Sequence, residues 1–107
     1  MIGISMLNEI RGIVMTKKDD VATALADLEA SSVARARLGN EVIETEIKEP
    51  IPFGHKYAIS EIRKGELVIK YGEVIGETLE NIGVGELVHV HNIVGLRGRG
   101  DKVGRTR

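Results

Sequence analysis

Two of the chain's three histidines, His89 and His91, stand two residues apart in the apolar segment GELVHVHNIVG. In an extended strand, alternate side chains project from one face about 6.5 to 7 Å apart, so the two imidazoles could converge on one metal ion or one substrate. Two ligands do not complete a metal site, so a third would have to come from His55, a carboxylate or another chain. The alternative is a pair of surface histidines on the polar face of an edge strand.

The third histidine, His55, stands beside Lys56 in the segment PFGHK. Pro52 suits the second position of a turn that starts at Ile51, and Gly54 suits the fourth, which predicts that His55 lies at the exit of the turn. An imidazole held there could act as a general acid or base. The alternative is a solvated histidine and lysine at the end of a turn.

Other kinds of chemistry find little support in the composition. The chain has no cysteine, which excludes disulfides, zinc–thiolate sites and thiol nucleophiles. Its glycine-rich segments match neither the dinucleotide fingerprint nor the P-loop. No window approaches the roughly 20 apolar residues that cross a bilayer, and the first residues lack the pattern of a signal peptide. We therefore expect a cytoplasmic protein without membrane contact.

The charge of the chain is unevenly distributed. Residues 97–107 carry five basic residues against one acidic residue, a balance of +4, which leaves −5 on the preceding residues because the net charge is −1. The glycine and arginine tail has the composition of a nucleic-acid-binding segment, but it is short and contains no aromatic residue on which bases could stack. We expect no nucleic-acid partner and interpret the tail as a docking segment that is flexible in part.

The elements that position the histidines are predicted to be mainly short strands. VARARL and EVIETEI alternate around Gly39 and Asn40, which predicts a tight hairpin with Arg35 opposite Glu44 and Ala36 opposite Ile43. Further along, IRKGELV and IGVGELV repeat the same pattern twenty residues apart. The repeat predicts two matching turns followed by strands, with Glu66 and Glu86 in equivalent places.

One helix is predicted ahead of the hairpin, in the segment TKKDDVATALADLEA. Val21, Leu25 and Leu28 recur at helical spacing, alanines fill the positions between them, and Asp19 or Asp20 could cap the first turn. The expected fold class is therefore mainly β with one or two short helices.

Three segments carry a resemblance to a known family. DDVATALADLEA, PFGHKYAISEIRKGELVIKYGEVIGETLENIGVGELVHVHNI and the following LRGRGD resemble the amino-terminal SAF domain of the altronate and galactarate dehydratases. A related small subunit occurs in sulfolactate sulfo-lyase. The resemblance implies a SAF domain with a β-clip, antifreeze-like fold. The expected division is an extension of unknown role at residues 1–12, the SAF domain at 13–95, and the basic tail at 96–107.

The resemblance also implies a function. The chain would be the small subunit of a metal-dependent sugar-acid dehydratase, inactive alone and completed by a large catalytic subunit. A divalent metal, iron or another, would be bound mainly by that partner, and a homo-oligomer is compatible with this arrangement. The alternative is a free-standing SAF module that binds a carbohydrate or carboxylate without catalysis.

The family's motifs match five positions of this chain. His55, Lys56, His89 and His91 are the expected catalytic residues, Asn92 is the expected substrate-binding residue, and His89 and His91 are candidate metal ligands.

One segment departs from the family's pattern. Related chains have a proline and an Asp-Asn pair in approximately HPxDNVA before the predicted helix, where this chain has MTKKDDVA, with Lys17, Lys18, Asp19 and Asp20. If this loop approaches the substrate, its different charge leaves the particular acid open.

Overall fold

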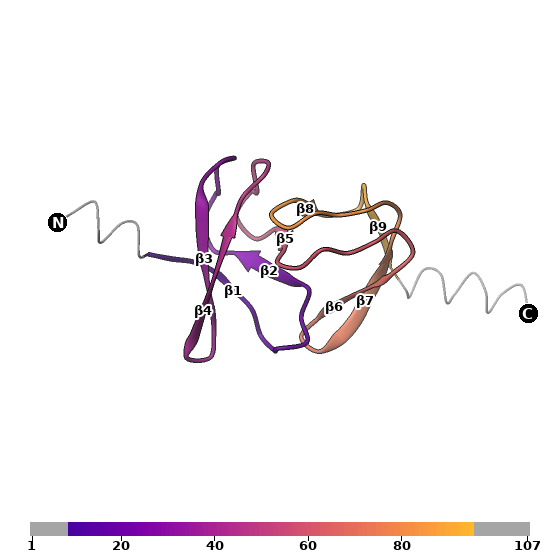
Figure 1. Cartoon of the computed structure of the whole chain (residues 1–107), viewed down its shortest axis with the longest axis horizontal. Coiled ribbons are helices and arrows are strands. Elements are labelled where there is room, and N and C mark those ends of the chain that lie inside the picture. The colour runs from indigo at the N-terminus through magenta and orange to yellow at the C-terminus, as the bar shows by residue number, and fades with distance from the viewer. Residues whose placement is uncertain (1–8, 96–107) are drawn as a thin grey trace, which may run out of the picture.

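The computed structural model describes residues 9–95, which form nine short strands and no helix (Figure 1). The strands are β1 (Ile10–Ile13), β2 (Val21–Ala24), β3 (Val33–Leu38), β4 (Glu41–Glu46), β5 (Lys56–Ala58), β6 (Leu67–Lys70), β7 (Glu73–Thr78), β8 (Leu87–Val88) and β9 (Ile93–Gly95). A six-stranded sheet has the order β4-β3-β1-β2-β5-β8, and a three-stranded sheet has the order β6-β7-β9. The mainly β fold class is confirmed.

The predicted helix is wrong, because its first turn is strand β2. Val21, Ala22 and Ala24 are buried, and β2 pairs antiparallel with β1 on one side and β5 on the other. Small alanines fit a strand that is enclosed by its neighbours, so tertiary pairing overrides their helix propensity. Leu28, the last residue of the expected apolar stripe, instead forms an isolated antiparallel bridge with Ile51.

The predicted hairpin between β3 and β4 is confirmed in its register. Arg35 pairs with Glu44 and Ala36 with Ile43. The first pair forms a salt bridge, while Ala36 is fully buried. Gly39 adopts a φ of 60° at the turn, as the tight connection requires.

Strand β1 lies between β2 and β3 in the larger sheet. The folded domain therefore includes residues 10–12, which were expected to belong to an extension. The remainder of that extension up to residue 8, and the basic tail at 96–107, lie outside the described residues.

Strand β5 separates two hydrophobic clusters. Tyr57 belongs to the first cluster, which packs against β1, β2 and β3, whereas Ala58 belongs to the second, which includes Val68 and Val88. Because successive side chains of a strand point to opposite faces, β5 contributes to both clusters from one short segment. In Figure 1, β5 and β8 accordingly lie between β1–β4 on one side and β6, β7 and β9 on the other.

The predicted internal repeat is confirmed as two matching turns. The carboxylate of Glu66 accepts a hydrogen bond from the backbone N–H of Arg63 at 2.8 Å, and that of Glu86 accepts one from Gly83 at 2.9 Å. The two copies meet at Ile62 and Ile82, which form an antiparallel bridge and are both buried.

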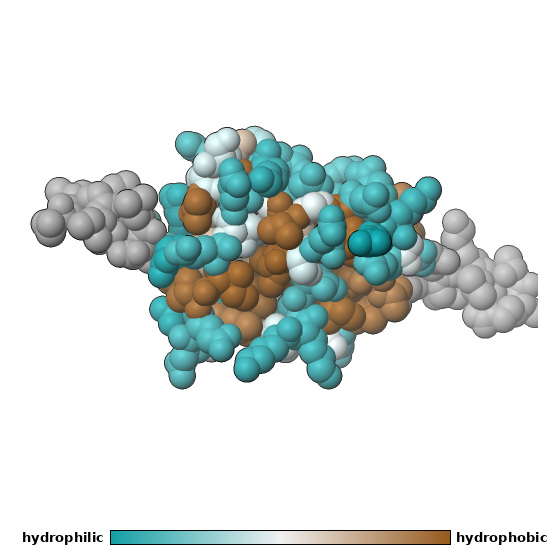
Figure 2. Space-filling view, in the orientation of Figure 1, coloured by the Kyte–Doolittle hydropathy of each residue, from teal (hydrophilic) through white to brown (hydrophobic). Residues whose placement is uncertain are grey.

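The face of the molecule seen in Figure 2 has apolar side chains across its middle, interrupted by polar ones, between mainly polar upper and lower margins. Several large apolar side chains of the described residues are indeed exposed, among them Met15, Leu25, Phe53 and Leu67.

Candidate functional site

The imidazole rings of His55 and His89 are in contact at the end of strands β5 and β8. Lys56 pairs with Val88 in the ladder between these antiparallel strands, so His55 and His89 are the next residues along it. Their ring centroids lie 4.8 Å apart with the planes tilted by 53°. His55 is half-buried and His89 is exposed, so the pair is open to solvent from one side.

His55 is held by a turn that lies one residue later than predicted. The N–H of His55 donates to the carbonyl of Pro52 at 3.0 Å, which makes His55 the fourth residue of the turn. Gly54 is the third residue and has a φ of 84°, a position that favours glycine. The ladder then continues through the carbonyl of His55, which accepts the N–H of Ala24 at 2.8 Å.

His89 and His91 do not lie on a strand, because β8 ends at Val88. The N–H groups of Asn92 and Ile93 both donate to the carbonyl of His89, at 3.0 and 3.1 Å, and so close a turn over residues 89–92. The expected alternation of the two imidazoles on one face is therefore wrong. His91 is exposed, and within residues 9–95 its ring contacts no other ring and makes no hydrogen bond.

Asn92 is buried beneath this turn, with 2% of its surface exposed. Its side-chain oxygen accepts a hydrogen bond from the N–H of His89 at 2.9 Å, and its side-chain nitrogen donates to the carbonyl of Leu87 at 2.7 Å. Both polar ends of the carboxamide are thus engaged within the domain.

Lys56 points away from the imidazole pair. It shares its row of the sheet with Thr23 and Val88, and Val88 belongs to the second hydrophobic cluster. Burial lowers the pKa of Lys56, and the positive charge of Lys70 lowers it further. Strand alternation therefore separates His55 from Lys56, although the two are adjacent in sequence.

Lys70 was not identified from the sequence. It lies at the end of β6, with its ammonium 3.8 Å from the centroid of the Tyr71 ring, and its charge acts on Lys56. The repeat does not mark it, because the second copy has Val90, an apolar residue, in the place of Lys70.

The loop in which this chain departs from its relatives is fixed by Asp19. The carboxylate accepts the Thr16 hydroxyl at 2.6 Å and the N–H of Gly72 at 2.8 Å, which joins the β1–β2 connection to the β6–β7 hairpin at the lower edge of Figure 1. Burial alone would raise the pKa of Asp19, but these bonds and others from Tyr71 and Thr16 outweigh it and lower the pKa. Lys17 and Lys18 are exposed at the tip of this loop.

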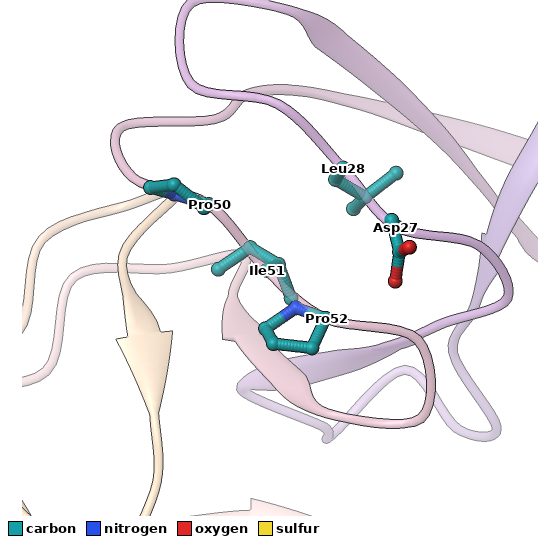
Figure 3. A pocket seen from close by; sticks show the side chains of 5 residues that line it. All are labelled: Asp27, Leu28, Pro50, Ile51 and Pro52. Atoms are coloured by element: carbon teal, nitrogen blue, oxygen red, sulfur yellow. The ribbon is translucent and has the colours of Figure 1, made fainter.

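An open hollow of about 260 Å³ lies at the base of the turn that carries His55 (Figure 3). Its lining consists of Asp27, Leu28, Pro50, Ile51 and Pro52. Asp27 is held in place because its carboxylate accepts the N–H of Phe53 at 2.8 Å. The lining offers no cationic group to a negatively charged acid, so the hollow is a poor site for such a substrate.

The described residues of this chain bring together too few ligands for a typical metal site. Within residues 9–95, no group of three or more histidine, aspartate or glutamate side chains is placed to hold an ion. The contact between His55 and His89 brings together two imidazoles, one fewer than the three protein ligands of a typical catalytic zinc site.

The family model of the altronate/galactarate dehydratase SAF domain matches residues 10–96. The chain belongs to this family. The match begins where β1 begins and includes the turns of both contacting histidines, so the imidazole pair lies within the SAF domain.

Several curated proteins are similar to this chain. Altronate dehydratase of Bacillus subtilis (strain 168) is 36% identical over 80 residues, which cover 75% of this chain and 15% of that protein. Altronate dehydratase of Escherichia coli (strain K12) is 43% identical over 75 residues, which cover 69% of this chain and 14% of that protein.

A shorter relative is the (2R)-sulfolactate sulfo-lyase subunit alpha of Chromohalobacter salexigens, which is 44% identical over 54 residues. The match covers 50% of this chain and 57% of that subunit. The SAF domain described here thus spans a small part of the two dehydratases and somewhat more than half of the sulfo-lyase subunit. Within residues 9–95 there is no helix that is long and apolar enough to cross a membrane.

Proposed function

We propose that this SAF domain is the small subunit of a sugar-acid dehydratase, a hydro-lyase of the altronate and galactarate type, and acts with a separate large catalytic subunit in the cytoplasm. The family match and the relatives named as dehydratases and as a lyase subunit support this class of reaction. The contact between His55 and His89 is the observation on which the active-site role rests.

The imidazole pair suits the proton transfers of a dehydration. The reaction removes a proton from the carbon next to the carboxylate and expels the hydroxyl of the neighbouring carbon as water, which needs a base and an acid. A neutral imidazole accepts a proton and a protonated one donates, so two adjacent rings can divide these tasks. Because His89 is exposed on a turn and His55 is half-buried behind it, a partner surface that covers the turn would enclose both rings.

A divalent metal in the assembled enzyme would be held mainly by the large subunit, because the described part of this chain supplies too few ligands. Such an ion would polarise the departing hydroxyl as a Lewis acid. Lys56 contributes positive charge on the other face of the sheet, and its role would be to attract or orient an anionic group there.

Reconstitution tests this function. The chain is mixed with the large dehydratase-type subunit of the same organism, and turnover of altronate, galactarate and sulfolactate is measured with Fe²⁺ present. We expect activity only in the mixture, reduced about 100-fold or more by His55→Ala or His89→Ala. Lys64→Ala, an exposed change on a distant turn, is the control.

Two results would contradict the proposal. Unchanged turnover in both histidine variants would remove the imidazole pair from the mechanism. Binding of a sugar acid by the chain alone, with no activity in any mixture, would identify a free-standing binding module instead of a subunit.

A further inference from the structure

The two copies of the repeat are related by more than their sequence, because residues 58–69 and 78–89 make the same backbone bonds in exchanged positions. In the first matching pair, the N–H of Gly65 donates to the carbonyl of Thr78 at 3.0 Å, and the N–H of Gly85 donates to the carbonyl of Ala58 at 2.8 Å. In the second pair, the N–H of Thr78 donates to the carbonyl of Glu66 at 2.9 Å, and the N–H of Ala58 donates to the carbonyl of Glu86 at 3.0 Å. The domain therefore contains an internal two-fold relationship in which residue 69 corresponds to residue 89.

In this two-fold relationship, Asp20 occupies the place that corresponds to Asn92. The N–H of Asp20 donates to the carbonyl of Ile69 at 2.8 Å, and the Asp20 carboxylate accepts the N–H of Ile69 at 2.9 Å. Asn92 makes the same reciprocal pair with His89, at 3.0 and 2.9 Å. Each of the two residues thus bonds both backbone groups of the residue that follows a GELV segment, and we call this pair of bonds a clamp.

The strands that follow the two clamps are also equivalent. Val21, next to Asp20, pairs with Ala58, and Ile93, next to Asn92, pairs with Thr78.

The group that contacts the second polar atom of each side chain explains why one residue is an aspartate and the other an asparagine. The second oxygen of Asp20 accepts the hydroxyl of Ser60 at 3.1 Å. At the other clamp the second group is the carbonyl of Leu87, which needs a donor and receives one from the Asn92 side-chain nitrogen at 2.7 Å. A carboxylate at residue 92 would face this carbonyl with no proton to share, which is unfavourable in a buried place.

We propose that Asn92 is a positioning residue, which clamps the backbone of His89 so that its imidazole stays against that of His55. The family resemblance implies that Asn92 binds the substrate, but its side chain is buried and bonded to the backbone at both ends. His89 itself is exposed, so packing does little to fix it, and the clamp supplies the constraint. The consequence for catalysis rests on the proposed function, whereas the clamp itself does not.

The test uses the full chain alone, without partner or substrate, and measures amide hydrogen exchange and nuclear Overhauser effects by NMR. In Asn92→Ala we expect the His89 amide to exchange about 10-fold faster or more, because it loses a hydrogen-bond acceptor. We also expect the Overhauser effect between the two imidazole rings to disappear, while the Ile69 amide changes by less than about 2-fold.

The equivalent clamp is the matched control. Asp20→Ala should accelerate exchange at Ile69 and leave both the His89 amide and the Overhauser effect between the rings unchanged. Asn92→Asp keeps an oxygen for the His89 N–H but turns a carboxylate toward the Leu87 carbonyl, so it should weaken that Overhauser effect without abolishing it.

Three results would overturn the positioning role. The first is an Overhauser effect between the rings that persists in Asn92→Ala with normal His89 exchange. The second is an equal weakening of this Overhauser effect in Asp20→Ala. The third is an Asn92→Asp chain that folds but shows no Overhauser effect between the rings. None of these depends on whether the chain belongs to a dehydratase, so the clamp and the proposed function fail separately.

Discussion

The centre of the His55 ring lies 4.8 Å from the centre of the His89 ring, because two turns from different parts of the chain meet at the same end of the β5–β8 ladder. His55 closes the turn that begins at Pro52, and His89 opens the turn that Asn92 closes. The pair is therefore a product of the pairing between β5 and β8 and not of the His-x-His spacing.

The first prediction separates the chemistry of this pair from the stability of the fold. Since neither ring is fully buried, His55→Ala and His89→Ala should each change the free energy of unfolding by less than about 1 kcal/mol. Urea denaturation of the isolated chain measures this change. A decrease of several kcal/mol in either variant would mean that the ring is part of the core, and that a fall in reconstituted activity had a structural cause.

The second prediction concerns the lysine on the opposite face of the sheet. Lys70→Gln should raise the pKa of Lys56 toward its ordinary value, although burial will keep it from reaching that value. An NMR titration of the lysine side-chain carbons measures the shift, and Lys64→Gln, on an exposed turn, is the control. An unchanged Lys56 titration in Lys70→Gln would show that the two ammonium groups do not interact.

The lowered pKa of Lys56 also makes the free energy of unfolding depend on pH. Because the pKa of Lys56 is lower in the folded chain, the unfolded chain binds more protons as the pH approaches 10.5, so this group's contribution to stability rises with pH there.

The sequence predicted the parts of the fold that depend on local pattern. Charge and apolar alternation indicated the hairpin register at Arg35 and Glu44, and the repeated GELV predicted the matching turns of Glu66 and Glu86. The prediction failed at β2, because the alanines that suggest a helix also fit a strand enclosed on both sides, and only the pairing with β1 and β5 decides between them.

The candidate site was predicted in its residues but not in its geometry. The resemblance selected the histidines, yet a strand through residues 87–92 would have placed His89 beside His91. The strand ends early because the Asn92 side chain bonds the N–H of His89, and side-chain competition of this kind carries no periodic signal.

The third prediction tests the carboxylate that joins the β1–β2 loop to the β6–β7 hairpin. Burial opposes ionisation of Asp19, but its hydrogen bonds outweigh burial, so its folded-state pKa is below 3.8. The stabilisation is therefore present above pH 3.8 and disappears as the pH falls through the folded-state pKa. Asp19→Asn should cost about 1 to 3 kcal/mol at pH 7.

Urea denaturation at several pH values measures this cost. The difference between Asp19→Asn and the parent chain should shrink below pH 3.8, where the parent loses the ionised form as well. Asp27→Asn is a suitable control, because that carboxylate is exposed and accepts the N–H of Phe53. A pH-independent difference would show that charge plays no part.

The fourth prediction concerns a buried hydroxyl. Tyr57 is fully buried, its hydroxyl has no hydrogen-bond partner among the described residues, and burial raises its pKa to about 12. Tyr57→Phe should therefore leave stability unchanged or raise it by up to about 1 kcal/mol. A side chain at Gly12 would lie 2.5 Å from the same oxygen, so Gly12→Ala should be destabilising.

A double-mutant cycle connects these two changes. Part of the cost of Gly12→Ala should disappear when Tyr57→Phe is also present, because the phenyl ring lacks the oxygen that clashes. Thermal or urea unfolding of the four chains measures the interaction energy. If the changes in the free energy of unfolding are strictly additive, the contact between the side chain introduced at Gly12 and the Tyr57 hydroxyl is relieved by a movement elsewhere in the domain.

The last prediction uses the repeat as its own control. Gly65 and Gly85 occupy equivalent turns with φ of 86° and 90°, so alanine is strained by the same backbone at both. At Gly65 a new side chain would meet nothing within 4 Å, whereas at Gly85 it would overlap the carbonyl of Glu46. Gly65→Ala should thus cost about 1 to 2 kcal/mol, the strain alone, and Gly85→Ala should cost clearly more.

The difference in the free energy of unfolding between the two variants, measured by urea denaturation, isolates the close approach of Gly85 to the last residue of β4, Glu46. The carbonyl of Gly85 also accepts the N–H of Lys48 at 2.9 Å, so displacing this turn breaks a bond between the second repeat copy and the segment that follows β4. Equal costs at the two positions would show that the turn moves away freely and that this bond does not hold β8 in place. A larger cost at Gly85 would show that the strand leading to His89 is anchored on the β4 side of the molecule.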